Sequence, residues 1–209
     1  MSNVTLYQGD SRTIDFPPVD AVITDPVWPN CPDHLLPGWR DPFELLQTVL
    51  ERITAKRIVI VLRYDSDPRF LSAVPARWPF FRVQELRYAI PGYNGRKLGG
   101  FEFAYCFGEP VASQPGRRVI PGMGPVVTKP TPANGHPAPR AIEHFRWLVN
   151  WWTEPDETIL DPFMGSGTTG LAAAQMGRNF IGAEIEPEYF GIAEQRIKDM
   201  TPMLFTATL

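Results

Sequence analysis

The stretch that decides the fold runs from Ile159 to Tyr189 and reads ILDPFMGSGTTGLAAAQMGRNFIGAEIEPEY. Its pattern predicts a strand, a glycine-rich turn, a helix and a second strand that ends in an acid, which is how a nucleotide-binding α/β unit begins. Only 209 − 184 = 25 residues follow Glu184, too few to supply the rest of such a sheet. The remaining strands are therefore expected in the sequence that precedes this unit.

The preceding sequence contains several candidate strands. Apolar runs at 19–25 and 57–62 flank a helical pattern at 41–53, which is typical of a parallel crossover unit. Residues 80–90 and 100–108 alternate as strands do, and the glycine-bearing segment between these two predicts a loop.

The middle of the chain is rich in proline. Eight prolines fall between Pro110 and Pro139, so this stretch predicts an extended connection rather than a helix or a central strand. Amphipathic helices are predicted at 139–152 and 187–200. Together the elements predict an α/β fold, with a circularly rearranged doubly wound (Rossmann-like), mostly parallel sheet and a small Pro/Gly-rich insertion.

The composition indicates a soluble globular protein. Cys31 and Cys106 are far apart, and two thiols with three histidines make no metal-ligand pattern, so we expect neither a disulfide scaffold nor a metal. The N-terminus lacks the apolar core of a signal peptide, and the longest aliphatic run, 58–62, is too short to span a membrane. A cytoplasmic protein without a membrane segment is expected.

The formal net charge of −3 is unevenly distributed along the chain. Residues 82–140 contain eight Lys/Arg and three Glu, which gives 8 − 3 = +5, so the remainder carries −3 − 5 = −8. A basic segment in an acidic body is typical of a localised contact with a polyanion, although scattered arginines in a solvated loop would give the same count.

Three glycines after the strand at 159–161 match the spacing G-x-G-x-x-G: Gly165, Gly167 and Gly170. Such glycines permit a tight turn and the close approach of a ligand to the backbone, and Thr168 or Thr169 can begin the helix. The loop lacks the Lys of a phosphate-binding P-loop, so ATP or GTP hydrolysis is disfavoured.

Two acids flank this loop. Glu184 lies 184 − 161 = 23 positions after Asp161, at the end of the next strand, where a carboxylate can accept both hydroxyls of a ribose. NAD and S-adenosylmethionine both carry such a ribose. Asp161, at the strand tip before the loop, favours S-adenosylmethionine, because a carboxylate attracts an ammonium group and repels a pyrophosphate.

A second constellation, ITDPVWPN, occupies residues 23–30. Asp25 follows a buried strand, Pro26 has no N–H to compete for its carbonyl, and Trp28 offers a stacking face. The carboxylate and a backbone carbonyl together provide two acceptors for an exocyclic amine, and Trp28 can hold a flat base taken out of its duplex. A strand-ending Asp-Pro turn beside a core tryptophan would show the same residues.

With both constellations in this order, the sequence resembles the β-type DNA amino-methyltransferases, which methylate adenine N6 or cytosine N4. The catalytic motif of that family, a polar residue, two prolines and an aromatic, is matched by Asp25, Pro26 and Trp28, while Val27 replaces the second proline. The family's cofactor motif, F-x-G-x-G, begins here at Phe163.

Further matches lie outside these two motifs. The segment YQGD makes Asp10 a candidate contact to the cofactor's adenine, and HPAPRA resembles the family's segment before the cofactor strand, with Arg140 matching and Ala141 departing. The resemblance implies catalytic roles for Asp25, Pro26 and Trp28. It implies that S-adenosylmethionine is held by Asp10, His136, Asp161, Phe163, Gly165, Gly167, Thr168 and Glu184.

The resemblance also implies the reaction and its partners. We expect site-specific methylation of adenine N6 in duplex DNA with the target base flipped out, in a restriction-modification setting, because Asp rather than Ser at the first motif position favours adenine by analogy. Cytosine N4, or an RNA or protein amide, are the alternatives within the fold. An NAD-dependent oxidoreductase and a catalytically silent DNA-binding module are the alternatives from other classes.

The division of the chain follows from the same resemblance. Residues 1–209 are expected to form one methyltransferase domain, with a catalytic half at 1–90, a short target-recognition region at about 90–135 and a cofactor-binding half at 136–209. A recognition region this short predicts a short target, a homodimer or a second subunit. The candidate DNA contacts are Tyr93, Asn94, Arg96, Lys97, Arg117 and Arg118.

Overall fold

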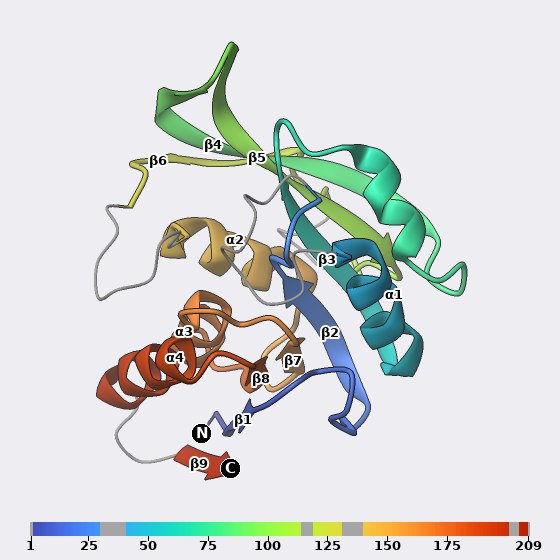
Figure 1. Ribbon diagram of the computed structural model, residues 1–209, viewed down its shortest axis with the longest axis vertical. Helices are drawn as coiled ribbons and strands as arrows, with labels where there is room; N and C mark the ends of the chain where they lie inside the picture. The colour runs from blue at the N-terminus through green and yellow to red at the C-terminus, as the bar shows by residue number, and fades with distance from the viewer. Residues whose placement is uncertain (1, 30–40, 114–118, 131–139, 201–204, 209) are drawn as a thin grey trace.

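The computed structural model describes residues 2–29, 41–113, 119–130, 140–200 and 205–208, and the side chains of 93–94 and 205–208 lie outside this description. Among these residues, nine strands form one sheet in the order β6-β4-β5-β3-β2-β7-β8-β1-β9 (Figure 1). The strands are β1 (Val4–Gln8), β2 (Val19–Thr24), β3 (Ala55–Arg63), β4 (Phe80–Asn94), β5 (Lys97–Gly108), β6 (Met123–Val127), β7 (Thr158–Asp161), β8 (Asn179–Glu184) and β9 (Phe205–Thr208).

The sheet is built from both ends of the chain. β7 pairs in parallel with β2, with Ala21 opposite Ile159, and β8 pairs in parallel with β1, with Val4 opposite Phe180. Only β5 runs antiparallel to its neighbours β3 and β4 in the described sheet. The prediction of a circularly rearranged, mostly parallel sheet is confirmed, since β1 and β2, which precede the glycine loop in sequence, lie beside β8 and β7.

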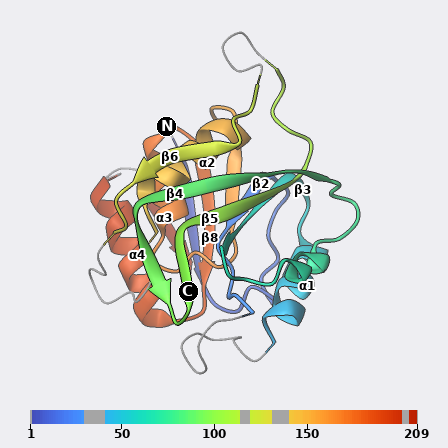
Figure 2. The same cartoon turned by 90° about the horizontal axis from the view of Figure 1, so that it is seen from above.

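Helices cover both faces of the sheet, as a doubly wound fold requires. They are α1 (Pro42–Arg52), the 3₁₀ helix η1 (Pro68–Ala73), α2 (Ile142–Trp152), α3 (Thr168–Gln175) and α4 (Pro187–Met200). Figure 2 shows α1 and α4 on opposite sides of the strands. On β3, Val59 and Val61 pack into the cluster with α2, α3 and α4, whereas Ile58 and Ile60 pack into the cluster with α1. This alternation is the two-residue period of a strand buried on both faces.

The local sequence explains where α1 begins. Asp41 accepts a hydrogen bond of 2.9 Å from the backbone N–H of Glu44, and Pro42 occupies the first turn, where its missing N–H costs nothing. Leu46 and Leu50 are fully buried on one helix face, four residues apart. The helix predicted at 41–53 is thereby confirmed.

The loop predicted between the strands at 80–90 and 100–108 is wrong. β4 continues to Asn94 and β5 resumes at Lys97, so the loop shrinks to two residues. A register shift between Arg87 and Gly92 accommodates Pro91, which has no N–H for the ladder, and pairing then resumes with Gly92 opposite Gly99. The end of this hairpin projects at the top of Figure 1.

In the proline-rich stretch, β6 pairs in parallel with β4 at the sheet edge, as an extended non-central segment should.

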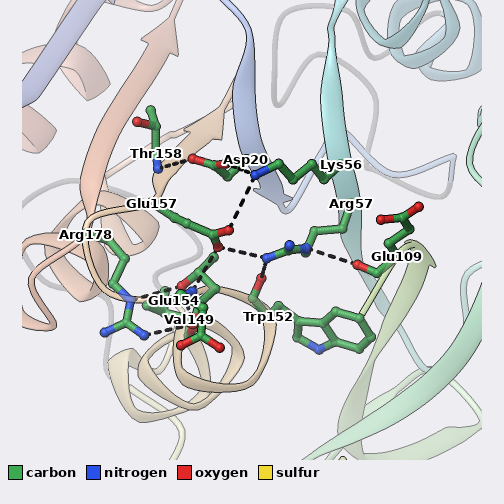
Figure 3. Close-up of polar contacts among 11 residues, drawn as sticks. Asp20, Lys56, Arg57, Glu109, Val149, Trp152, Glu154, Glu157, Thr158 and Arg178 are labelled. Atoms are coloured by element: carbon green, nitrogen blue, oxygen red, sulfur yellow. Dashed lines mark hydrogen bonds and ion pairs between the residues drawn. The ribbon is translucent and has the colours of Figure 1, made fainter. Parts of the chain in front are cut away.

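A buried arginine ties the amino ends of β3 and β7 to the end of α2 (Figure 3). Arg57 Nη1 lies 2.8 Å from Glu157 Oε2 and donates to the carbonyl of Trp152 at 3.0 Å, and its Nε donates to the carbonyl of Glu109 at 3.0 Å. Next to it, Lys56 reaches Asp20 at 2.6 Å. These contacts satisfy a buried cation at the edge of the sheet opposite to Asp25.

Candidate active site

Four parallel strands end at one edge of the sheet, and the sequence singled out residues at each of these ends. In spatial order the strands are β2, β7, β8 and β1. Asp25 follows β2, the glycine loop follows β7, Glu184 closes β8 and Asp10 lies beyond β1. Open α/β sheets bind their ligands at the carboxyl ends of the strands. The residues predicted for the acceptor and for the cofactor therefore occupy neighbouring strand ends.

The glycine loop turns through the left-handed region into α3. Gly165 has φ +51° and Gly167 has φ +76°, values that residues with a side chain rarely adopt. Helical residues begin at Thr168, and no side chain caps the helix, so neither threonine serves as its capping residue. A Cβ on Gly167 would lie 2.9 Å from the Cβ of Ala193 in α4. The loop backbone therefore turns tightly and packs directly against the next helix.

Glu184 holds this loop in place. Its Oε2 accepts from the backbone N–H of Gly165 at 2.9 Å, and its Oε1 accepts from the backbone N–H of Glu186 at 2.9 Å. The side chain is almost completely buried, and this burial raises the pKa of the carboxyl while the two N–H donors oppose the rise. Arg196 of α4 supports the same loop by donating to Ser166 Oγ at 2.9 Å.

Asp161 is buried among hydrogen-bond donors from three elements. Its Oδ1 accepts from Thr24 at 2.7 Å and from the backbone N–H of Phe163 at 3.1 Å, and its Oδ2 accepts from Thr169 at 2.6 Å. Burial raises the pKa of Asp161 to about 7, although these donors favour the ionised form. Both oxygens are thus engaged within the protein, which differs from the free carboxylate that the sequence suggested; contact with an ammonium group stays a prediction.

The other residues predicted for the cofactor lie around this edge. Asp10 pairs with Arg12, whose Nη2 lies 2.6 Å from Oδ2, and this hydrogen bond lowers the pKa of Asp10 despite partial burial. Phe163 is half-buried against the cluster that includes α1. His136 lies outside the described residues.

The acceptor motif meets an arginine that is 115 residues away in sequence. Asp25 Oδ2 accepts from Arg140 Nε at 2.5 Å, and the guanidinium carbon lies 4.4 Å from the ring centroid of Trp28. Trp28 donates its indole N–H to the carbonyl of Val61 at 3.3 Å, and Pro26 is buried. Burial raises the pKa of Asp25 to about 6, with Arg140 opposing the rise and Glu102 adding to it.

Glu102 and Tyr88 complete this cluster, and the sequence reasoning missed both. Glu102 Oε1 lies 3.5 Å from Arg140 Nη1, and its Oε2 accepts from the Tyr88 hydroxyl at 3.0 Å. The side chain of Glu102 is only 8% exposed. A signal was present, because Glu102 alternates with Ala104 and Cys106, which places a charge on the buried face of a strand.

The candidate DNA contacts are only partly brought together. Arg96 is exposed in the turn between β4 and β5, and Lys97 opens β5 with its Nζ 3.6 Å from Asp65. Tyr93 and Asn94 belong to β4, not to the loop in which they were expected, and their side chains are outside the description. The remaining candidates, Arg117 and Arg118, lie outside the described residues.

Part of the basic charge at 82–140 is directed inward. Arg82 donates to the carbonyl of Ile120, and Arg140 contacts Asp25 inside the protein. Arg87 stays exposed, but it is paired with Glu85 at 3.3 Å. The charge count of this segment therefore overstates the cationic surface that a polyanion could reach.

Two expected absences can be compared with the described part of the chain. Within the described ranges, no group of three or more His, Cys, Asp or Glu is arranged to hold a metal ion. None of the described helices is long and apolar enough to cross a membrane.

Burial raises the pKa of the Cys106 thiol far above its usual range, which excludes it as a ready nucleophile.

The fold and this edge define a Rossmann-like methyltransferase domain: a parallel sheet with a glycine loop, a buried acid one strand further, and an Asp-Pro-x-Trp acceptor motif at the adjacent strand end. A family model for DNA methylases of the N6/N4 type matches residues 76–195, more than half of the chain. The chain therefore belongs to this DNA methylase family.

Individual relatives agree with the assignment. The chain is 46% identical over 50 residues to the type II methyltransferase M.HinfI of Haemophilus influenzae, an alignment that covers 24% of this chain and 14% of M.HinfI. It is 39% identical over 69 residues to M2.MboI of Moraxella bovis, covering 33% of this chain and 25% of that one. The chain thus spans a quarter or less of the length of these curated relatives.

A solved structure matches nearly end to end. The crystal structure of the M1.HpyAVI-SAM complex superposes with a TM-score of 0.73 at 27% identity, covering 93% of this chain and 98% of that one.

Proposed function

We propose that this chain transfers a methyl group from S-adenosylmethionine to an exocyclic amine of a base in duplex DNA. One observation carries the proposal: Asp25 and the glycine loop lie at the ends of the adjacent strands β2 and β7, which the 2.7 Å hydrogen bond between Thr24 and Asp161 ties together. A methyl donor and an amine must lie next to one another for transfer, and proximity supplies much of the acceleration in such reactions.

The residues at the ends of β7, β8 and β1 fit S-adenosylmethionine. Glu184 is a buried carboxylate at a strand end and suits the ribose hydroxyls, while the Gly165–Gly167 backbone permits close approach of the ligand. Asp10 would reach the adenine after release from Arg12. When bound, S-adenosylmethionine supplies an electrophilic methyl on a sulfonium. The M1.HpyAVI-SAM complex, which has the same fold, is consistent with this ligand.

Asp25 is proposed to act on the acceptor amine. An aromatic amine is a poor nucleophile, because its lone pair is delocalised into the ring. Hydrogen bonds from the amine to Asp25 and to the carbonyl of Pro26 would favour a tetrahedral nitrogen and stabilise the positive charge that develops on it. As the new N–CH₃ bond forms and the S–CH₃ bond breaks, the amine becomes acidic, and its proton leaves to Asp25 or to water. Trp28 is proposed to stack on the base.

Adenine N6 is the proposed acceptor atom, on the analogy that Asp stands first in the motif. The matching family includes both N6 and N4 enzymes, so cytosine N4 is the second candidate. Membership of a DNA methylase family argues against an NAD-dependent oxidoreductase. A homodimer remains a prediction.

The test compares two matched substitutions. The purified chain is incubated with mixed-sequence duplex DNA and methyl-deuterated S-adenosylmethionine, and the nucleosides are analysed by mass spectrometry. We expect labelled N6-methyladenine from the wild type and from Asp15→Ala, whose side chain is 95% exposed, and a loss of about 100-fold or more in Asp25→Ala, which removes the hydrogen-bond acceptor. Labelled N4-methylcytosine would correct only the base.

Two further outcomes would overturn the proposal. An absence of any labelled nucleoside, with S-adenosylmethionine binding shown by calorimetry, would exclude DNA as the acceptor for this chain. Transfer that persists in Asp25→Ala would exclude the acceptor site.

A further inference from the structure

Arg140 occupies the place in which the target base is proposed to bind. Its Nε donates to Asp25 Oδ2 at 2.5 Å, and its guanidinium carbon stands 4.4 Å from the centroid of the Trp28 ring. The Arg140 side chain is 13% exposed, so the contact is made inside the protein.

A guanidinium and an aminated base present the same chemistry to these two residues. Both are planar, both place N–H donors in the plane, and both offer a flat face to an aromatic ring. Asp25 and Trp28 would accept either one, and they cannot hold both in the same position. The base can therefore enter only if Arg140 moves.

Glu102 is placed to receive the arginine. Its Oε1 is 3.5 Å from Arg140 Nη1, and its buried carboxylate is already held by the Tyr88 hydroxyl at 3.0 Å. A short swing from Asp25 toward Glu102 would keep the cation paired with a carboxylate throughout, which avoids burying an isolated charge.

Within the described part of the chain, one carboxylate oxygen of Asp25 is left without a hydrogen bond. Its Oδ1 is inaccessible to solvent and has no hydrogen-bond partner among the described residues. Buried acceptors are normally paired, so an unpaired one at this position fits a donor that arrives with the substrate.

We infer that Arg140 holds the acceptor site in place of the target base, and that it withdraws onto Glu102 when the base enters. This inference rests on the proposed function. Arg140 is then a positioning residue, because it sets the fraction of enzyme molecules whose acceptor site is open to a base. The apparent affinity for DNA is reduced in proportion to that fraction.

The arginine has a second, separable effect through its charge. The charged and titratable groups around Asp25 are Arg140, Glu102, Tyr88, Asp161 and Arg63, the last of which lies 5.4 Å from the Trp28 centroid. Arg140 favours ionised Asp25, while Glu102 disfavours it. On the acidic side of the pH–activity profile (the acid limb), methyl transfer falls as Asp25 becomes protonated. Loss of the Arg140 charge should therefore shift this acid limb to higher pH.

Three variants separate these effects: Arg140→Gln, Arg140→Lys and Glu102→Gln. Methyl transfer to mixed-sequence duplex DNA is measured from pH 5 to 9, with S-adenosylmethionine saturating. For Arg140→Gln we expect the acid limb to move up. At pH 9, the alkaline end of the series, we expect kcat/KM for DNA to rise roughly three- to tenfold, because no side chain competes with the base. Arg140→Lys restores the charge and should return the acid limb toward that of the wild type.

Glu102→Gln tests the receiving position and does not depend on the stability of the Arg140 variants. Without a carboxylate to receive it, Arg140 should stay on Asp25, so the KM for DNA should rise and the acid limb should move to lower pH. Folding of each variant is checked by its thermal unfolding.

The outcomes distinguish this inference from the proposed function. If the wild type transfers methyl groups but Arg140→Gln lowers kcat/KM for DNA at pH 9, Arg140 assists the base instead of holding its place, and the inference fails alone. An unchanged KM for DNA in Glu102→Gln would also overturn it. If the wild type transfers nothing, the proposed function fails and the inference fails with it.

Discussion

The hydroxyl of Thr24 donates a hydrogen bond of 2.7 Å to Asp161, and so joins the carboxyl ends of β2 and β7. The two residues are 137 positions apart in sequence. One precedes the acceptor motif and the other precedes the glycine loop, so this buried contact adds to the β2–β7 ladder in holding the two halves of the proposed site together.

Replacing Thr24 by Val should destabilise the protein by about 1–3 kcal/mol, because Val has the same shape but leaves Asp161 Oδ1 with one donor fewer in a buried site. Urea unfolding measures this change in the free energy of unfolding. Thr24→Ser keeps the hydroxyl and should lose less. Equal stability of Thr24→Val and the wild type would show that the contact contributes nothing.

Asp161 should make stability depend on pH. Its pKa is raised to about 7 in the folded protein from the ordinary value of 3.8, so the folded state retains a proton that the unfolded state has lost. The free energy of unfolding should therefore fall as pH rises from about 4 to 7. Asp161→Asn should flatten this dependence in urea titrations at several pH values. A slope that is unchanged in Asp161→Asn would assign the effect to other groups.

Gly167→Ala should cost more stability than Gly177→Ala. Both glycines adopt left-handed backbone, with φ +76° and φ +73°, so alanine meets similar conformational strain at each. A Cβ at Gly167 would come within 2.9 Å of Ala193, whereas a Cβ at Gly177 meets nothing within 4 Å. The difference in thermal unfolding therefore isolates the overlap with α4, which we expect to add about 1–3 kcal/mol. Equal losses would contradict direct packing of the loop on α4.

Arg57→Met should destabilise the protein by about 3–5 kcal/mol, because Glu157 and two backbone carbonyls would lose a buried donor. Lys56→Met is the control: its side chain is 57% exposed, and solvent-exposed ion pairs contribute little to stability. Figure 3 shows the two side chains next to each other. Chemical unfolding of both variants checks the contrast, and a small loss in Arg57→Met would refute the structural role of this cluster.

The arrangement of the sheet could be predicted because its signals are local. β2, β3, β7 and β8 are apolar runs, and the glycine loop marks the end of β7. β1 and β9 alternate apolar and polar residues in short runs, and neither is predicted as a strand from the sequence. The acceptor motif could be placed near the cofactor motif for the same reason, since strand ends of one parallel sheet meet at one edge.

What could not be predicted depends on distant pairs. Arg140 reaches Asp25 across 115 positions, and the involvement of Glu102 follows from that contact. Asp161 looked like a free carboxylate because its hydroxyl donors are not neighbours in sequence. Pro91 suggested a loop, but tertiary pairing of the hairpin on both sides of it outweighed the local preference.

The pairing of β1 with β8 bears on how the protein is made. Val4 is synthesised before its partner Phe180, which follows 176 residues later. Until β7 is synthesised, β2 lacks its neighbour on that side. The nascent chain then carries an open strand edge that can pair with other chains. Contacts so distant in sequence also close slowly. The order of synthesis therefore delays assembly of the site until the last parallel strands emerge, and any product that stops before β7 carries the acceptor motif without the strand that supports it.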